Sequence, residues 1–312
     1  MDNSIASKST NPATDESPAE DQTPPKRINN FDLFLLQVRS PPADPIIRYI
    51  RSFLSKFTSS HQTYNTEDQA RLVQNFKLFI FERFNEYEPF CRMKEDQLWN
   101  SRVGMEKLLM TRLYSYVYSP ELLNLKRTVN ASHQQDLDID SQIFANYITF
   151  QDVLTPSDFE VDPQLVSLGD NFMKISIEEL AKINNFQTPR AKLVCVLNAC
   201  KALIQLLKST QSVSNADEFL PLLIYTVFKG QIECLYCNLK YIERYAFEID
   251  GGNEVEYYLV CLSSAAEFIK NLHKEFANKL NEDGSITLNE EPPVVVDESV
   301  EFSGKSDNLI DM

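Results

Sequence analysis

Glycine is scarce in this chain, with seven residues among 312, and the short turn-forming clusters that separate β-strands are few. A β-sheet protein of this length would need many such turns, so their scarcity argues against that class. Apolar residues make up 43% of the sequence, and they recur mainly at the 3.6-residue spacing of helices. The sequence therefore predicts an all-α protein with enough apolar residues for a sizeable core.

Long apolar runs are absent as well. No stretch approaches the roughly 18 consecutive apolar residues of a membrane-spanning helix. The segment from Met1 to Glu20 is polar, which is not the pattern of a secretory signal peptide. We therefore expect a cytoplasmic protein without an integral membrane segment, whose six cysteines are reduced thiols.

The chain also lacks a basic stripe. Its net charge is −15, of which residues 1–30 carry −2 and residues 281–312 carry −8, which leaves −5 for residues 31–280. This balance argues against a nucleic-acid partner and against a purely electrostatic membrane anchor. Residues 1–29 and 279–312 are rich in polar and acidic residues, and we predict that both are disordered tails.

Motifs of covalent and metal chemistry are missing too. There is no nucleophile elbow, no glycine-rich phosphate loop and no HExxH helix. The only close cysteine pair is Cys234 and Cys237, and a zinc site would need two further ligands that the three histidines do not supply. Two thiols facing a core are the favoured interpretation, so we expect no metal and no cofactor. A metal or redox protein built on this pair is the weakest of the hypotheses.

Apolar periodicity and proline positions predict where the helices lie. We expect irregular chain over residues 121–132 and a loop-rich segment over 156–188 with short helical pieces near Pro163–Leu168 and Ser176–Ile183. The expected helices are Phe31–Leu36, Asp44–Phe57, a long one carrying Leu72 to Phe84, one within 95–120, Asp136–Leu154, one opened by Thr188–Lys192, one from about Glu233 to Ala246, and one starting near Glu256.

One stretch organises the chain. Two adjacent acids, Asp217 and Glu218, come just before Pro221 and an apolar run with helical spacing. Because proline fits best in the first turn of a helix, we predict that the helix begins close to Leu220 or Pro221 and that the acids lie on the preceding turn. From these residues alone, helix capping is the simpler interpretation. A pair of acid–base residues is less favoured, because no pocket motif accompanies them.

Several stretches together resemble the vacuolar-protein-sorting-nine (Vps-nine) exchange-factor domain, which activates endosomal Rab GTPases. The resemblance covers about residues 30–278. The stretches in combination are specific to this family, whereas any single stretch would not be. The matching text is GMEKLLMTRLY at 104–114, TPRAKLVCVLN at 188–198, ADEFLPLLIY at 216–225, NLKYIERY at 238–245 and EYYL at 256–259.

This resemblance implies the domain organisation and the function. Residues 30–94 would be a helical bundle packed on a layered, all-helical Vps-nine-type exchange domain at 95–278. The function implied is guanine-nucleotide exchange on endosomal Rab GTPases of the Rab-five subfamily, without covalent chemistry and with peripheral recruitment to endosomes. The alternative is a non-catalytic Rab-binding adaptor with the same fold.

The resemblance also assigns roles to residues. The family's catalytic aspartate matches Asp217, a carboxylate finger inserted toward the P-loop lysine and the Mg²⁺ site of the GTPase. Its catalytic tyrosine matches Tyr257, which would contact a switch region. Pro221, Glu218 and Tyr258 are expected to bind the partner. The sequence departs from the family pattern three residues after the tyrosine, where the usual threonine is replaced by Val260.

Overall fold

The computed structural model describes residues 30–210, 216–246 and 252–280. Over these ranges the chain forms α-helices and short 3-10 helices and contains no β-strand, which confirms the predicted all-α class. None of the helices in the described ranges has the length and apolar character needed to cross a membrane. The predicted tails lie outside the described residues, except that Lys279, in a final 3-10 turn, forms an ion pair with Asp158.

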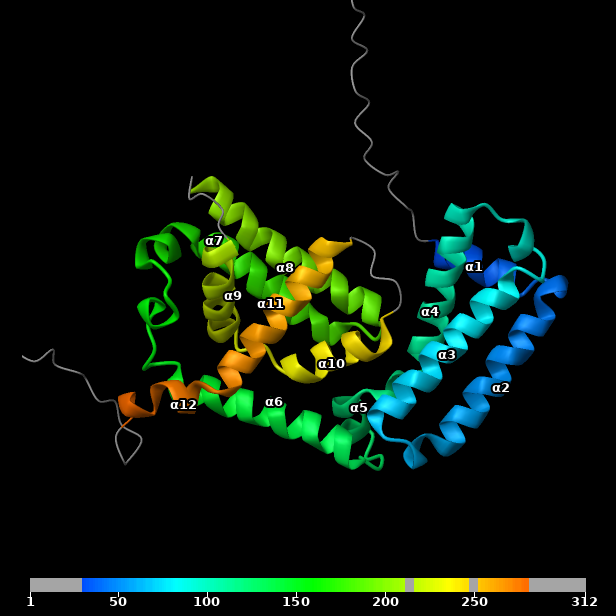
Figure 1. Cartoon of the computed structure of the whole chain (residues 1–312), viewed down its shortest axis with the longest axis horizontal. Coiled ribbons are helices and arrows are strands. Elements are labelled where there is room, and N and C mark those ends of the chain that lie inside the picture. The colour runs from blue at the N-terminus through cyan, green and yellow to red at the C-terminus, as the bar shows by residue number, and fades with distance from the viewer. Residues whose placement is uncertain (1–29, 211–215, 247–251, 281–312) are drawn as a thin grey trace, which may run out of the picture.

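The first four long helices form an N-terminal bundle, seen at the right of Figure 1. Gly104 lies where the first and fourth helices cross, and a β-carbon there would come within 2.4 Å of the Phe34 ring, so only glycine permits this approach. The boundary predicted between residues 94 and 95 remains a prediction, and the helix that follows it packs within this bundle. The four helices are α1 (Phe31–Val38), α2 (Asp44–Ser60), α3 (Thr66–Phe84) and α4 (Glu95–Val117).

A second apolar core lies at the left of Figure 1, where α11 (orange) runs between α9 and α10. Its helices are amphipathic, and the stripe of α8 that was read from the sequence is buried against α7. The contributing helices are α6 (Ala131–Phe150), α7 (Pro163–Ala181), α8 (Pro189–Ser209), α9 (Ala216–Gly230), α10 (Leu235–Tyr245) and α11 (Asn253–Lys270).

Helix α7 corrects one prediction. The sequence predicts a loop-rich segment between residues 156 and 188, yet one continuous helix spans Pro163–Ala181. Gly169 lies inside it, and a glycine within an apolar pattern is typical of a helix break. Here the missing side chain serves packing, because a β-carbon at Gly169 would come within 2.3 Å of Leu206 on α8. The close contact between the two helices offsets the low helix propensity of glycine.

Two further helix ends differ from the predictions. The helix predicted within 95–120 ends at Val117, and Pro120 lies in the first turn of a short helix, α5 (Ser119–Asn124), where its missing N–H costs nothing. This short helix also corrects part of the irregular chain predicted over residues 121–132. The last helix, predicted to start near Glu256, spans Asn253–Lys270, and α12 (Leu272–Phe276) follows as a separate element.

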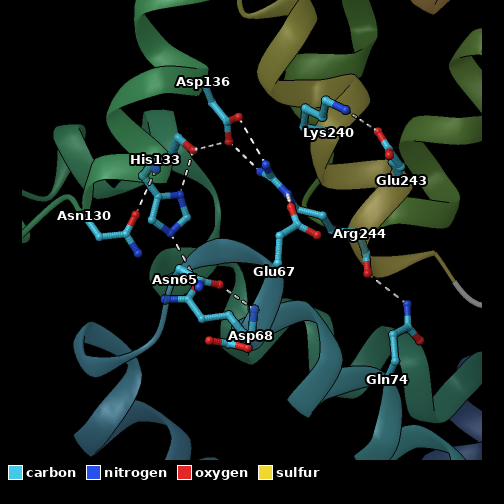
Figure 2. Close-up of polar contacts among 12 residues, drawn as sticks. Asn65, Glu67, Asp68, Gln74, Asn130, His133, Asp136, Lys240, Glu243 and Arg244 are labelled. Atoms are coloured by element: carbon cyan, nitrogen blue, oxygen red, sulfur yellow. Dashed lines mark hydrogen bonds and ion pairs between the residues drawn. The ribbon is translucent and has the colours of Figure 1, made fainter.

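A polar junction joins the end of α10 to the N-terminal bundle (Figure 2). The guanidinium of Arg244 donates to both carboxylate oxygens of Asp136 on α6, at 2.5 and 3.2 Å, and to Glu67 on α3 at 3.1 Å. From α3, the Gln74 side chain donates to the backbone carbonyls of Arg244 and Ala246, at 2.9 and 3.1 Å. The carbonyl of Arg244, in the last turn of α10, and that of Ala246, just after the helix, are therefore satisfied by the bundle.

Candidate functional site

The first turns of α9 and α11 lie together because of one aromatic residue, Phe219. Its ring is buried, with its centroid 5.9 Å from that of Tyr257 and 5.7 Å from that of Tyr258. Asp217 is two residues before Phe219 on the same turn of α9. The structure therefore brings the predicted aspartate and the predicted tyrosine to one place, although 40 residues separate them in the sequence.

The start of α9 corrects the prediction made from Pro221. The helix begins at Ala216, so Asp217 and Glu218 lie in its first turn and Pro221 lies inside it. Proline there cannot donate to the carbonyl of Asp217, four residues earlier, so one backbone bond is lost. Two effects compensate. Phe219 is buried only if the helix includes it, and acids in the first turn interact favourably with the helix dipole.

Asp217 is exposed to solvent at the tip of this turn, as is the neighbouring Glu218, while Pro221 is half-buried. A carboxylate in this position can reach into another molecule without unfolding its own helix. The partner contacts assigned to Glu218 and Pro221 remain predictions.

Tyr257 and Tyr258 differ in exposure. Tyr257 is 40% exposed, and its hydroxyl donates a hydrogen bond to the sulfur of Cys261, one helical turn later. Partial burial and this hydrogen bond raise the pKa of Tyr257 to about 12, so its hydroxyl is neutral at physiological pH. Tyr258 is 5% exposed, and its hydroxyl donates to Glu254 at 2.9 Å. The ring of Tyr258 belongs to the core, and a partner contact through it remains a prediction.

Sequence reasoning missed two residues that support this junction. Phe219 was read only as part of an apolar stripe, and its position two residues after Asp217 was the available signal. Cys261 follows Tyr257 by four residues, the spacing at which side chains meet on a helix. Phe219 lies on the same turn as Asp217, and Cys261 lies one turn after Tyr257.

The motif lysine Lys192, on α8, is a core residue and not part of the exposed junction. Its side chain is fully buried, and its Nζ donates to the backbone carbonyl of Ile183 at 2.9 Å and to the Asn238 side chain at 2.6 Å. Burial lowers the pKa of Lys192 to about 8. Three rings surround the cation at 4.7–5.8 Å, namely those of Tyr114 on α4, Tyr118 between α4 and α5, and Tyr241 on α10.

The cysteine pair shows no arrangement for metal binding. Cys234 precedes α10, and Cys237 lies inside that helix and is buried. Burial raises the pKa of the Cys234 thiol to about 11 and raises the pKa of the Cys237 thiol as well, so neither is a ready thiolate. Within the described parts of the chain, no three His, Cys, Asp or Glu side chains come together as a metal site.

Two segments of the chain, one in the N-terminal bundle and one in the second core, match known protein families. Residues 173–274, which include α9, α10 and α11, match the sequence profile of the Vacuolar sorting protein 9 (VPS9) domain. Residues 48–114 match a second profile, described as a domain of unknown function (DUF5601). The first match contains Asp217 and Tyr257, and the second lies within the N-terminal bundle.

Three similar proteins cover most of this chain. It is 34% identical over 262 residues to the vacuolar protein sorting-associated protein vps901 of Schizosaccharomyces pombe, covering 83% of this chain and 45% of that protein. It is 31% identical over 247 residues to vacuolar protein sorting-associated protein 9A of Oryza sativa subsp. japonica, covering 78% and 48%. It is 29% identical over 221 residues to the Rab5 GDP/GTP exchange factor of Homo sapiens, covering 70% and 42%.

The chain spans less than half the length of these relatives. The helical fold and the matched segments agree with the all-helical Vps-nine-type domain that the resemblance implied. The chain contains a VPS9 domain at residues 173–274, as the resemblance found in the sequence indicated.

Proposed function

We propose that this protein promotes the release of GDP from endosomal Rab GTPases of the Rab5 subfamily, with Asp217 as a carboxylate finger. The single observation that supports this most is the exposed junction of Asp217 and Tyr257, held together by the buried Phe219 within the segment that matches the VPS9 domain. One relative is named as a Rab5 GDP/GTP exchange factor, which supports the choice of partner.

The proposed mechanism is electrostatic competition. A Rab GTPase holds its nucleotide phosphates through Mg²⁺, a P-loop lysine and backbone N–H groups. The carboxylate of Asp217 would pair with that lysine in place of a phosphate, and its charge would repel the phosphates. Tyr257, with its neutral hydroxyl, would contact a switch region of the GTPase. No covalent step is involved, and the protein itself needs no cofactor.

Thermodynamic linkage gives the direction of the effect. If the protein binds the nucleotide-free GTPase more tightly than the loaded form, nucleotide binding must weaken by the same factor. Because Asp217 is already exposed on a folded helix, insertion requires no local unfolding of this chain. We propose that the protein acts in the cytoplasm and peripherally at endosomes, where its partner GTPase resides.

The test is release of a fluorescent guanine nucleotide from purified Rab5-subfamily GTPases. Wild-type protein should accelerate release, and Asp217→Asn, which removes the charge but keeps the shape, should slow the accelerated rate at least about 100-fold. The matched control is Asp152→Asn, at another exposed carboxylate, which should behave as wild type. If the wild-type protein binds the GTPase but does not accelerate nucleotide release, the result would instead support the non-catalytic adaptor function.

A further inference from the structure

An apolar groove of about 870 Å³ runs between α10 and α11. Its apolar lining comes from Leu239 and Ile242 on α10, from Ala246 just after that helix, and from Leu259, Val260 and Ala266 on α11. The volume lies in the range of protein pockets that hold a whole small ligand, and is large enough for several side chains. This groove is on the α10 side of α11, whereas the junction of Phe219 and Tyr257 is on the α9 side.

The groove adjoins the proposed exchange site on α11, because Glu256 and Val260, which line it, are close to Tyr257 in the sequence. Val260 lines it and is 64% exposed, an unusual position for a branched aliphatic side chain. It follows Tyr257 by three residues, so the two side chains are neighbours on one face of α11. An exposed apolar surface beside a binding site is typical of a surface that a partner covers.

The charges on the rim indicate what kind of segment fits. Lys240 is already paired with Glu243, and Glu267 with Lys270. Glu256, next to Tyr257, also lines the groove, is exposed, and has no side-chain partner among the described residues. An occupant that places a cation beside Glu256 is therefore favoured.

The same charges disfavour the C-terminal part of this chain as the occupant. Residues 281–312 contain nine acids and one lysine, so they would meet the rim carboxylates as like charges. A partner protein with an apolar segment next to a basic residue fits the groove, because the segment would pack on the apolar lining and the basic residue would pair with Glu256.

We propose that the groove between α10 and α11 receives an apolar segment of the same GTPase into which Asp217 is inserted, with a basic side chain of that segment paired to Glu256. This proposal rests on the proposed exchange function and extends its contact surface. The groove would contribute to partner affinity and selection, while Asp217 acts on the nucleotide. Val260, which departs from the usual threonine, would then influence which GTPase fits.

The experiment measures nucleotide release by the full chain over a range of GTPase concentrations, so that KM and kcat are separated. Ser263→Arg places a long side chain in the groove from an exposed position six residues after Tyr257. We expect its KM to rise at least about tenfold, with kcat at saturating GTPase unchanged. The matched control is Gln205→Arg, on the exposed face of α8 outside the groove, which should keep the wild-type KM.

A second variant tests the charge without filling the groove. Glu256→Lys should raise KM, and the increase should shrink at high salt because an exposed charge interaction is screened. If wild type accelerates release and Asp217→Asn does not, but both groove variants keep the wild-type KM, the groove proposal is overturned and the exchange function stands. If wild type accelerates release from no GTPase of the subfamily, both proposals are overturned.

Discussion

Two adjacent residues at the start of α11, Tyr257 and Tyr258, differ in environment although their side chains are identical. Tyr257 is exposed beside Asp217, whereas Tyr258 is buried against Phe219. Replacing each by alanine should therefore separate function from stability. For Tyr257→Ala we expect exchange to slow at least about tenfold, with a loss of only about 1 kcal/mol in unfolding free energy.

Tyr258→Ala is the matched control, and it should cost about 3–5 kcal/mol of stability because it leaves a cavity in the core. Nucleotide release and urea unfolding, measured on both variants, provide the comparison. If Tyr257→Ala destabilises the fold as much as Tyr258→Ala, the tyrosine has a packing role and no separate role in exchange.

His133, in the polar junction of Figure 2, makes stability depend on pH. Its imidazole is buried and bonded to Ser119 at 2.8 Å and to Gln69 at 3.3 Å. Burial lowers the pKa of His133 to about 4, against the opposing effect of Asp136, from an ordinary value of 6.5. The folded state thus favours the neutral ring. The stability that His133 contributes to the fold is therefore complete above pH 6.5 and is lost as the pH falls from 6.5 toward 4.

Between pH 7 and pH 5 this one group should therefore remove about 2 kcal/mol of unfolding free energy. The His133→Gln variant has no titrating group at this position. Between pH 7 and pH 5 its unfolding free energy should therefore fall by about 2 kcal/mol less than that of wild type. Urea denaturation at the two pH values measures both proteins. Equal losses in wild type and variant would contradict the assignment of the pH dependence to His133.

At the scale of elements, helix α10 depends on a buried ion pair with α6. Arg244 donates to both oxygens of Asp136, whose side chain is almost fully buried. Arg244→Met should cost about 3–5 kcal/mol, because it leaves a buried carboxylate without its cation. The change is measured by chemical denaturation of the full chain.

Lys240→Met on the same helix is the control for that variant. Lys240 pairs with Glu243 near the surface, so its loss should cost less than about 1 kcal/mol. Adding Asp136→Asn to Arg244→Met should recover part of the lost stability, because no buried charge then remains. Similar small costs for the two single variants would show that the junction does not hold α10.

Helices with unbroken apolar stripes, such as α3 and α8, could be predicted from the sequence because their burial and their periodicity agree. Helix α7 could not, since Gly169 weakens the local pattern and its reason is the contact with Leu206. The start of α9 could not be located from Pro221 alone, because burial of Phe219 outweighs one lost backbone bond.

At the scale of the whole molecule, the pairing of Asp217 with Tyr257 came from family resemblance and not from local pattern. Forty residues separate them in the sequence, and only the packing of α9 against α11 brings their turns together. The groove between α10 and α11 was not predicted, because its walls come from residues whose periodicity is that of ordinary core helices. A groove exists only once two helices are placed in space.

The measurement that tests the central claim most directly is the rate of fluorescent GDP release from Rab5-subfamily GTPases with wild type, Asp217→Asn and Asp152→Asn. We expect acceleration by wild type and by Asp152→Asn, and a loss of at least about 100-fold in Asp217→Asn while it still binds the nucleotide-free GTPase. Acceleration by Asp217→Asn equal to that of wild type would contradict the carboxylate-finger mechanism.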